Sequence, residues 1–173
     1  MLDSLSNIFK ITELRNKILY TLMMFAVFRA GIHIPVPGVD ASVIESLFTS
    51  GNLFGLLDLF AGGALSKFSI FAMSITPYIN ASIIMQLLQS VVPQFEAWSK
   101  DGEDGRKKIA KVTRYGTVVL GFVQAAGMAF ALRANNALVN NDFLSVFVVA
   151  IILTAGTCLL MWIGEQNHSI WYR

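Results

Sequence analysis

The sequence predicts an all-α integral membrane protein with four transmembrane helices and a short re-entrant helix. Of its 173 residues, 55% are hydrophobic and only 14% are charged, whereas a typical soluble domain is about 25% charged. The apolar residues also gather in long blocks, and a helix needs about 20 such residues to cross a bilayer. The excess of apolar residues is too large for one water-soluble core.

Four apolar blocks predict spanning helices at 18–34, 68–92, 115–132 and 143–164. The first block ends at the turn Pro35-Val36-Pro37-Gly38, because proline lacks an amide donor and fixes φ. No small-residue cleavage site follows it, so we expect a retained span rather than a signal peptide. Residues 1–17 place apolar side chains at helical spacing among charged ones, which predicts an amphipathic segment at the membrane surface. A solvated tail is the alternative.

The segment 35–67 is too broken by glycines and by Asp58 to span the bilayer as one helix, and too apolar for a free loop. Irregular backbone at membrane depth persists only inside protein or beside a water-filled cavity. We therefore expect a short helix folded back into the protein over about 52–67, with Asp58 facing outer water. A loop packed on the outer surface is the alternative. The remaining connections are 93–114, 133–142 and the C-terminal segment 165–173.

The basic residues predict the orientation, because cytoplasmic loops carry an excess of Lys and Arg. One side of the expected topology holds ten of the thirteen: Lys10, Arg15, Lys17, Lys100, Arg106, Lys107, Lys108, Lys111, Arg114 and Arg173. The other side holds Arg29, Lys67 and Arg133. We therefore expect a cytoplasmic N-terminus and four crossings, with 35–67 on or entering from the outer side. The 96–114 loop then serves mainly to set the topology.

Several function classes are excluded by charge and motif content. A formal net charge of +2 is too small to indicate nucleic-acid binding, and the single cysteine, Cys158, excludes an intrachain disulfide. His33 and His168 lie far apart, and no Cys/His cluster has metal-ligand spacing. No nucleophile and base form a plausible site, and no phosphate-binding loop motif is present. We expect no enzyme activity, no cofactor and no metal.

In the second apolar block, Ile75 and Ile79 lie four residues apart and share a helix face. Pro77 between them weakens the helix and lets it bend. Bulky aliphatic side chains that point into a pore make a constriction that excludes water. The two isoleucines could equally face lipid or neighbouring helices, and Asn80 and Gln86 could form helix–helix hydrogen bonds.

Five strings along the chain carry a resemblance to a known family. They are Phe28 to Gly38 (FRAGIHIPVPG), Phe60 to Ser66 (FAGGALS), Ile75 to Leu87 (ITPYINASIIMQL), Gly102 to Ile109 with Thr113 to Tyr115, and Met161 to Gln166 (MWIGEQ). In this order they resemble the SecY family of protein-conducting channels: the end of its first span, its plug, its second span, its first cytosolic connection and the end of its fourth span.

The resemblance implies roles for particular residues. Ile75 and Ile79 fall where the family places its pore ring. The plug, a segment that seals the closed pore from outside, corresponds to Phe54, Leu57, Phe60, Gly62 and Gly63. The lateral gate, the seam through which a signal sequence leaves for lipid, corresponds to Asn80, Ile83 and Ile84.

The resemblance also implies a biological setting. Such a channel translocates secretory polypeptides across the bacterial plasma membrane and inserts membrane proteins into it. Its expected partners are the SecE and SecG subunits, a SecA motor or ribosome, signal sequences and membrane lipid.

The family has ten spans in two halves, whereas four spans are recognised here and 167–173 does not match. We therefore expect this polypeptide alone not to conduct protein. A structural membrane subunit that binds SecE without translocating is one alternative. Half of a small-solute transporter is another, but the interiors of the last three spans carry no ionisable residue for an ion site.

Overall fold

The computed structural model describes residues 11–49, 56, 58, 59 and 63–171. Its regular elements in these ranges are helices: α2 (Thr12–Ile32), α3 (Ala41–Thr49), α5 (Thr76–Val91), α6 (Pro93–Lys100), α7 (Gly102–Ala134) and α8 (Phe143–Trp171). Pro35 with Ser69 and Val39 with Leu138 form isolated β-bridges. The all-α class expected from the sequence is confirmed for the described part of the chain.

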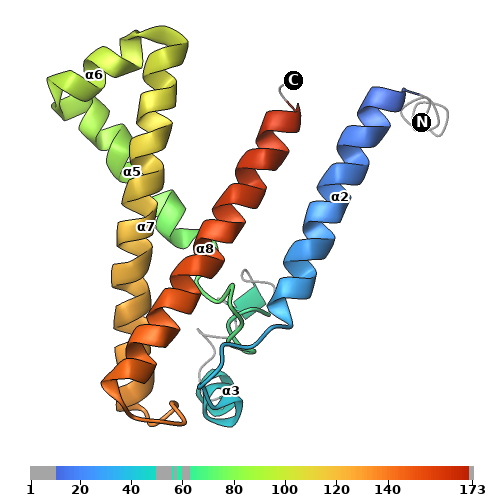
Figure 1. Ribbon diagram of the computed structural model, residues 1–173, viewed down its shortest axis with the longest axis vertical. Helices are drawn as coiled ribbons and strands as arrows, with labels where there is room; N and C mark the ends of the chain where they lie inside the picture. Colours follow the sequence, from blue (N-terminus) through green and yellow to red (C-terminus); the bar gives the residue numbers. More distant parts are fainter. Residues whose placement is uncertain (1–10, 50–55, 57, 60–62, 172–173) are drawn as a thin grey trace.

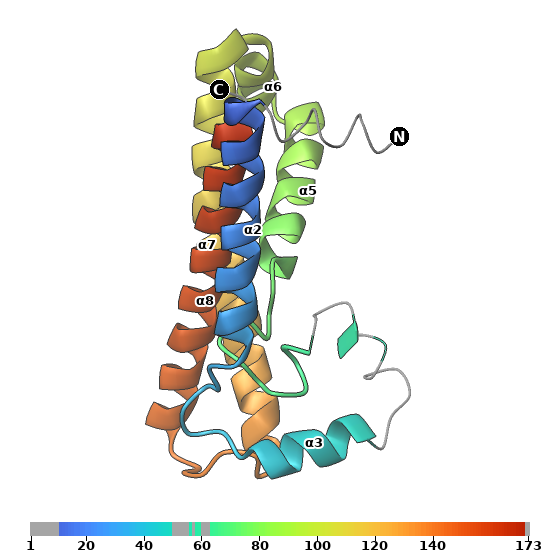
Figure 2. The same ribbon diagram turned by 90° about the vertical axis from the view of Figure 1, so that its right-hand side faces the viewer.

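α2, α7 and α8 run roughly lengthwise, α5 is inclined to them, and α3 lies across one end of the molecule (Figures 1 and 2). Antiparallel α7 and α8 form the centre, α5 packs mainly on α7, and α2 packs on α8. The described start of α2, the α6–α7 junction and the end of α8 lie at one end of the molecule. α3 and the α7–α8 connection lie at the opposite end. The basic segments at 15–17 and 100–114 therefore share one end, as the expected topology requires.

Two of the described helices, α7 and α8, are long and apolar enough to cross a bilayer. α2 has 21 residues, but Arg15, Lys17 and Arg29 fall within any 18-residue stretch of it. α5 has only 16 residues, fewer than the roughly 20 of a typical spanning helix. Crossing by α2 and α5 therefore stays a prediction.

The helix in the second apolar block begins later than the sequence suggested. Residues 63–75 form turns, and helix starts only at Thr76. Pro77 thus occupies the first turn of α5 instead of bending a longer helix. In the first turn its missing N–H costs no hydrogen bond, and its fixed φ suits a helix start. The expectation of a proline-weakened mid-helix bend is wrong for this reason.

Two segments expected to lie outside the spanning helices are helical. The 93–114 connection forms α6 and the first turns of α7, which meet at Asp101. The C-terminal segment from Glu165 continues α8 as far as Trp171. There the indole Nε1 of Trp171 donates to Thr21 Oγ1 on α2 at 3.0 Å, so the end of α8 is joined to α2.

We name residues 63–75 the strap, because this non-helical segment passes between α2 and α8. Val36 N donates to Phe68 O at 3.0 Å, and Ile70 N donates to Ile34 O at 3.1 Å. The ring of Phe71, only 2% exposed, stacks on Phe28 of α2 with centroids 5.7 Å apart. The irregular backbone is therefore satisfied by internal hydrogen bonds and buried in protein, as the low polarity of its surroundings demands.

Candidate pore-lining face

α5 presents two chemically different faces. Its buried residues Pro77, Ala81 and Met85 recur every four positions and face the other helices. A Cβ added to Gly121 of α7 would lie 3.6 Å from Pro77, and one added to Gly116 would lie 3.9 Å from Ala81. The small residues of α7 therefore let α5 pack close along one side.

Away from these packed residues, α5 and the residue before it carry bulky aliphatic side chains that are close to half exposed. Ile75, Ile79, Ile83 and Ile84 are 44%, 44%, 48% and 45% exposed. We call these four residues the isoleucine face. Leu87 and Val91 continue the same apolar surface toward α6. Because Ile79 N donates to Ile75 O at 3.0 Å, Ile75 is held in register with the helix although it precedes the first helical residue.

The lateral-gate residues lie on or beside this face. Ile83 and Ile84 belong to it, and Asn80 is half-buried between its two edges. Ser82 Oγ donates to Ile79 O at 2.8 Å, so this hydroxyl is satisfied within α5. The structure thus brings the expected pore-ring and gate residues together on one continuous surface.

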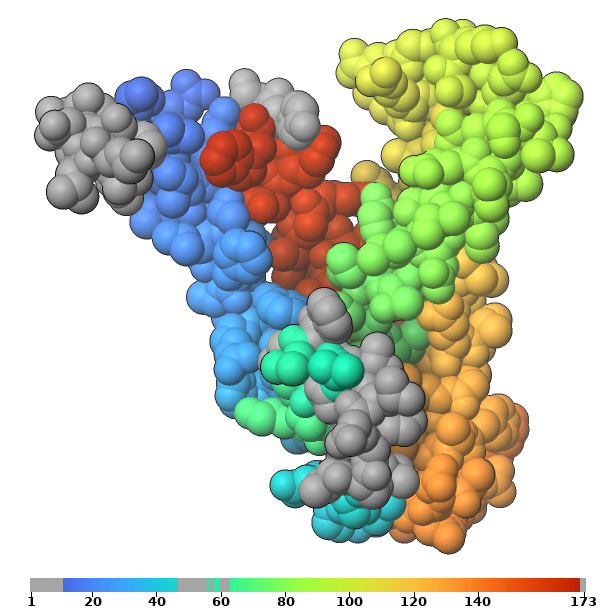
Figure 3. Space-filling view, turned by 180° about the vertical axis from the view of Figure 1, so that it is seen from behind, coloured from blue at the N-terminus to red at the C-terminus, as the bar shows by residue number. Residues whose placement is uncertain are grey.

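A pocket of about 580 Å³ opens beside the isoleucine face. Ile75 and Tyr78 line it from α5, Arg114 from α7, and Leu160 and Glu165 from α8. Figure 3 shows the molecule hollowed on this side, between the arm formed by α5 and α6 and the arm formed by α2 and α8. A smaller pocket of about 250 Å³ between α2 and α8 also includes Ile75. Ile75 therefore stands between two cavities.

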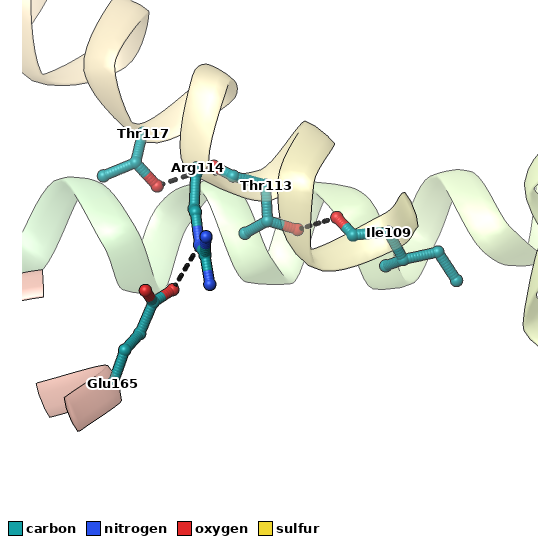
Figure 4. A network of polar contacts seen from close by, with 5 residues as sticks. All are labelled: Ile109, Thr113, Arg114, Thr117 and Glu165. Atoms are coloured by element: carbon teal, nitrogen blue, oxygen red, sulfur yellow. Dashed lines mark hydrogen bonds and ion pairs between the residues drawn. The ribbon is translucent and has the colours of Figure 1, made fainter. Parts of the chain in front are cut away.

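One ion pair crosses the hollow from α7 to α8. Arg114 Nε donates to Glu165 Oε1 at 2.7 Å (Figure 4). Beside it, Thr117 Oγ1 donates to Thr113 O, and Thr113 Oγ1 donates to Ile109 O. These buried hydroxyls are satisfied within α7, so the charged pair is the polar tie between the two helices here. The sequence offered both charges but no signal for their pairing, because they lie 51 residues apart.

Most of the expected plug falls outside the described residues, namely Phe54, Leu57, Phe60 and Gly62. Gly63 is described and has φ +83°, a left-handed conformation that glycine adopts without strain. Asp58 does not face open water as expected. It is half-buried, and its Oδ1 accepts from Leu65 N at 3.1 Å and Ser66 N at 3.0 Å. Asp58 is therefore hydrogen-bonded to the first residues of the strap.

Comparison with known proteins places these features in a family. A family model described as SecY matches residues 69–171, which includes Asn167 to Trp171 beyond the last resembling string. "Protein translocase subunit SecY" of Halalkalibacterium halodurans is 53% identical over 171 residues, and that of Bacillus subtilis is 52% identical over 173. That of Staphylococcus aureus is 47% identical over 172 residues.

The alignments cover nearly all of this chain but a minor part of each relative. The alignment with the Halalkalibacterium halodurans protein covers 96% of this chain and 39% of the relative. For the Bacillus subtilis protein the shares are 98% and 40%, and for the Staphylococcus aureus protein they are 96% and 40%. The chain therefore spans about 40% of the length of the curated relatives it matches.

Proposed function

Because the chain belongs to the SecY family, we propose that it forms one wall of a channel that translocates polypeptides across a membrane. The observation that carries this proposal is the isoleucine face of α5. Its four side chains are close to half exposed, although the opposite side of the same helix is packed against α7. An apolar surface of this kind suits a constriction that excludes water when a second wall meets it.

The hollow beside this face supports the same function. Its lining combines the apolar side chains of Ile75 and Leu160 with the charged Arg114–Glu165 pair. Polar groups close to an aliphatic constriction let a polypeptide stay hydrated until it reaches the seal. We propose that the hollow is the cytoplasmic entrance, because the basic segments lie at the same end of the molecule.

The lateral gate and the plug are part of this proposal. Ile83, Ile84 and the half-buried Asn80 offer a signal sequence one apolar surface with a polar group at its edge. For the plug, the hydrogen bonds from Leu65 N and Ser66 N to Asp58, which lies within 54–60, connect this residue to the strap. We propose that this segment closes the pore from the outer side and is displaced during translocation.

The partners and location follow from the family and remain proposals for this chain. We propose a multi-pass protein of the bacterial plasma membrane with a cytoplasmic N-terminus. It assembles with SecE and SecG and receives polypeptides from SecA or a ribosome. Two described helices of spanning length and apolarity support the membrane location.

The proposal is tested by resting ion conductance of the full-length channel that carries these residues, measured in planar bilayers without substrate. Ile79→Gly removes a side chain from the constriction and should raise the leak. Ile151→Gly on α8 is the matched control, since Ile151 has the same side chain and is 47% exposed. Both changes cost a similar amount of helix propensity, roughly 0.5 kcal/mol. A leak that is equal in the two variants means that Ile79 is an ordinary lipid-facing residue.

A second arm tests the plug. Deleting residues 54–60 should leave membrane insertion intact and raise the same resting conductance. A deleted channel as quiet as the intact one assigns these residues to an outer loop, the alternative that the sequence left open.

A further inference from the structure

The strap meets α8 at a contact that only glycine permits. A Cβ added to Gly156 would lie 2.0 Å from the carbonyl oxygen of Ile70 and 2.9 Å from its carbonyl carbon. Both atoms belong to the backbone, so no side-chain rotation can relieve the overlap. The strap therefore fits into a gap in the surface of α8 that exists because residue 156 has no side chain.

The next residue of α8 contacts the end of the strap. Thr157 is 2% exposed, and its Oγ1 donates to Ser74 O over a long 3.4 Å. Ser74 has φ +53°, and its N–H donates to Phe71 O at 2.8 Å. A non-glycine residue with positive φ is held there by its surroundings. Gly156 and Thr157 thus both contact the strap in the residues that lead into α5.

The strap leads directly into the isoleucine face. Ser74 is followed by Ile75, whose carbonyl oxygen accepts the Ile79 amide. The residue that Thr157 contacts is adjacent to Ile75, and the Gly156 contact at Ile70 lies only five positions before it, so a displacement of the strap moves the first residue of the face. α5 itself contacts α8 far less than it contacts α7, which leaves the strap as the connection between α8 and this end of the face.

We propose that Gly156 and Thr157 are positioning residues for the channel seal: they hold the strap on α8 and thereby align Ile75 and Ile79. The inference rests on the proposed function, in which the isoleucine face lines the pore. It adds that closure of the pore depends on the contact between the strap and α8. The two α8 residues that make this contact, Gly156 and Thr157, are not among the proposed pore-lining residues.

The test uses Gly156→Ala in the full-length channel. An ordinary carbon contact needs at least 3.4 Å, so the added methyl must displace Ile70 by more than 1 Å. Gly127→Ala on α7 is the control, because a Cβ there meets nothing within 4 Å. The first readout is the maleimide reaction rate of a thiol introduced by Ser69→Cys. Ser69 is 0% exposed, and peptide-resolved mass spectrometry separates this thiol from Cys158. The second readout is resting ion conductance.

We expect Gly156→Ala to raise the thiol reaction rate at least tenfold and the resting leak several-fold, with Gly127→Ala unchanged in both. An unchanged thiol rate shows that the strap has not moved and overturns the inference. A faster thiol reaction without leak also overturns it, because the seal is then independent of the strap. The Ile79→Gly experiment judges the proposed function separately: if it leaks while Gly156→Ala does not, only the inference fails.

Two milder substitutions, both of Thr157, provide the test if Gly156→Ala does not accumulate in the membrane. Thr157→Val keeps the shape of the side chain and removes the hydroxyl, whereas Thr157→Ser keeps the hydroxyl. The positioning role predicts a raised leak for Thr157→Val and near-normal conductance for Thr157→Ser. Equal leak in the two, or none in Thr157→Val, contradicts a role for the Ser74 contact.

Discussion

Arg114 of α7 and Glu165 of α8 are joined by a hydrogen-bonded ion pair of 2.7 Å, although the two residues lie 51 positions apart. The Arg114 side chain is 52% exposed and that of Glu165 is 27% exposed. Water screens a pair of this kind, and its expected coupling energy is about 0.5 kcal/mol.

A double-mutant cycle measures that coupling. Arg114→Gln and Glu165→Gln should each destabilise the detergent-solubilised protein slightly, and the double variant should lose little more than either one. Thermal unfolding at low and high salt provides the measurement, with the coupling smaller at high salt. A coupling energy above about 2 kcal/mol would mean that the pair is shielded from water by residues outside the described part of the chain.

Asp58 should control the order of the first residues of the strap. Its Oδ1 accepts two backbone N–H groups, from Leu65 and Ser66, and hydrogen bonds to a charged group contribute about 1.5–3 kcal/mol. Asp58→Ala should therefore abolish hydrogen-exchange protection at both amides. Asp58→Asn keeps an oxygen acceptor and should retain part of it. Full protection of these two amides in Asp58→Ala would show that other contacts hold this part of the strap.

Gly31 and Phe71 should behave as a coupled pair. A Cβ on Gly31 would lie 1.9 Å from Cε2 of Phe71, a side-chain atom. Gly31→Ala should therefore destabilise by about 1–3 kcal/mol through overpacking. The double variant with Phe71→Leu should recover part of the lost stability, because it removes the ring atoms that clash with the new Cβ. Thermal unfolding of the three variants measures the recovery, and purely additive losses would contradict the contact.

The stability of α3 should depend on pH below about 4. Asp40 directly precedes α3, and its Oδ1 accepts from Ser42 Oγ at 2.6 Å and Ser42 N at 3.0 Å. These hydrogen bonds, chiefly the one from the hydroxyl, lower the pKa of Asp40 from 3.8. A lowered folded-state pKa means that the contribution is complete above the unfolded pKa and is lost as pH falls through the folded value.

Carboxyl ¹³C titration of Asp40 by NMR checks the direction. Ser42→Ala should return the pKa toward 3.8. An Asp40 pKa at or above 3.8 in the unmodified protein would contradict the hydrogen bonds to Ser42.

The orientation of the chain is tested by cysteine labelling in intact cells. Asp104 at the start of α7 and Asn140 between α7 and α8 are exposed and lie at opposite ends of the molecule. An impermeant reagent outside the cell should modify Asn140→Cys and leave Asp104→Cys unmodified. The reverse pattern would place the basic end outside and overturn the predicted topology.

Hydropathy and charge predict the helices that local sequence controls. The third and fourth expected spans, 115–132 and 143–164, lie within α7 and α8. The pairing of Ile75 with Ile79 also follows from local spacing and is present. Helix in these two blocks and the i, i+4 contact could be predicted because helix periodicity and apolar length are properties of neighbouring residues.

Features set by tertiary contacts were not predictable in the same way. Residues 68–75 are as apolar as a spanning helix, yet they stay irregular. Gly156 and the α2 partners of Phe71 accommodate a non-helical path there, and Phe68 and Ser74 adopt positive φ. The Arg114–Glu165 pair and the two amides bound by Asp58 likewise depend on residues distant in sequence. No single-sequence pattern reports such contacts.

The continuous helix α7 has a mechanical consequence. Its 33 residues extend for about 50 Å at 1.5 Å per residue, whereas the hydrocarbon core of a bilayer is about 30 Å thick. If α7 crosses the bilayer, about 20 Å of it is longer than the hydrocarbon core requires. At its N-terminal end a Cβ on Gly105 would lie 1.8 Å from the Trp98 carbonyl oxygen, so the backbones of α6 and α7 are in close contact there. Because α5 also packs on α7, a force applied to α6 would be passed along α7 to the helix that carries the isoleucine face.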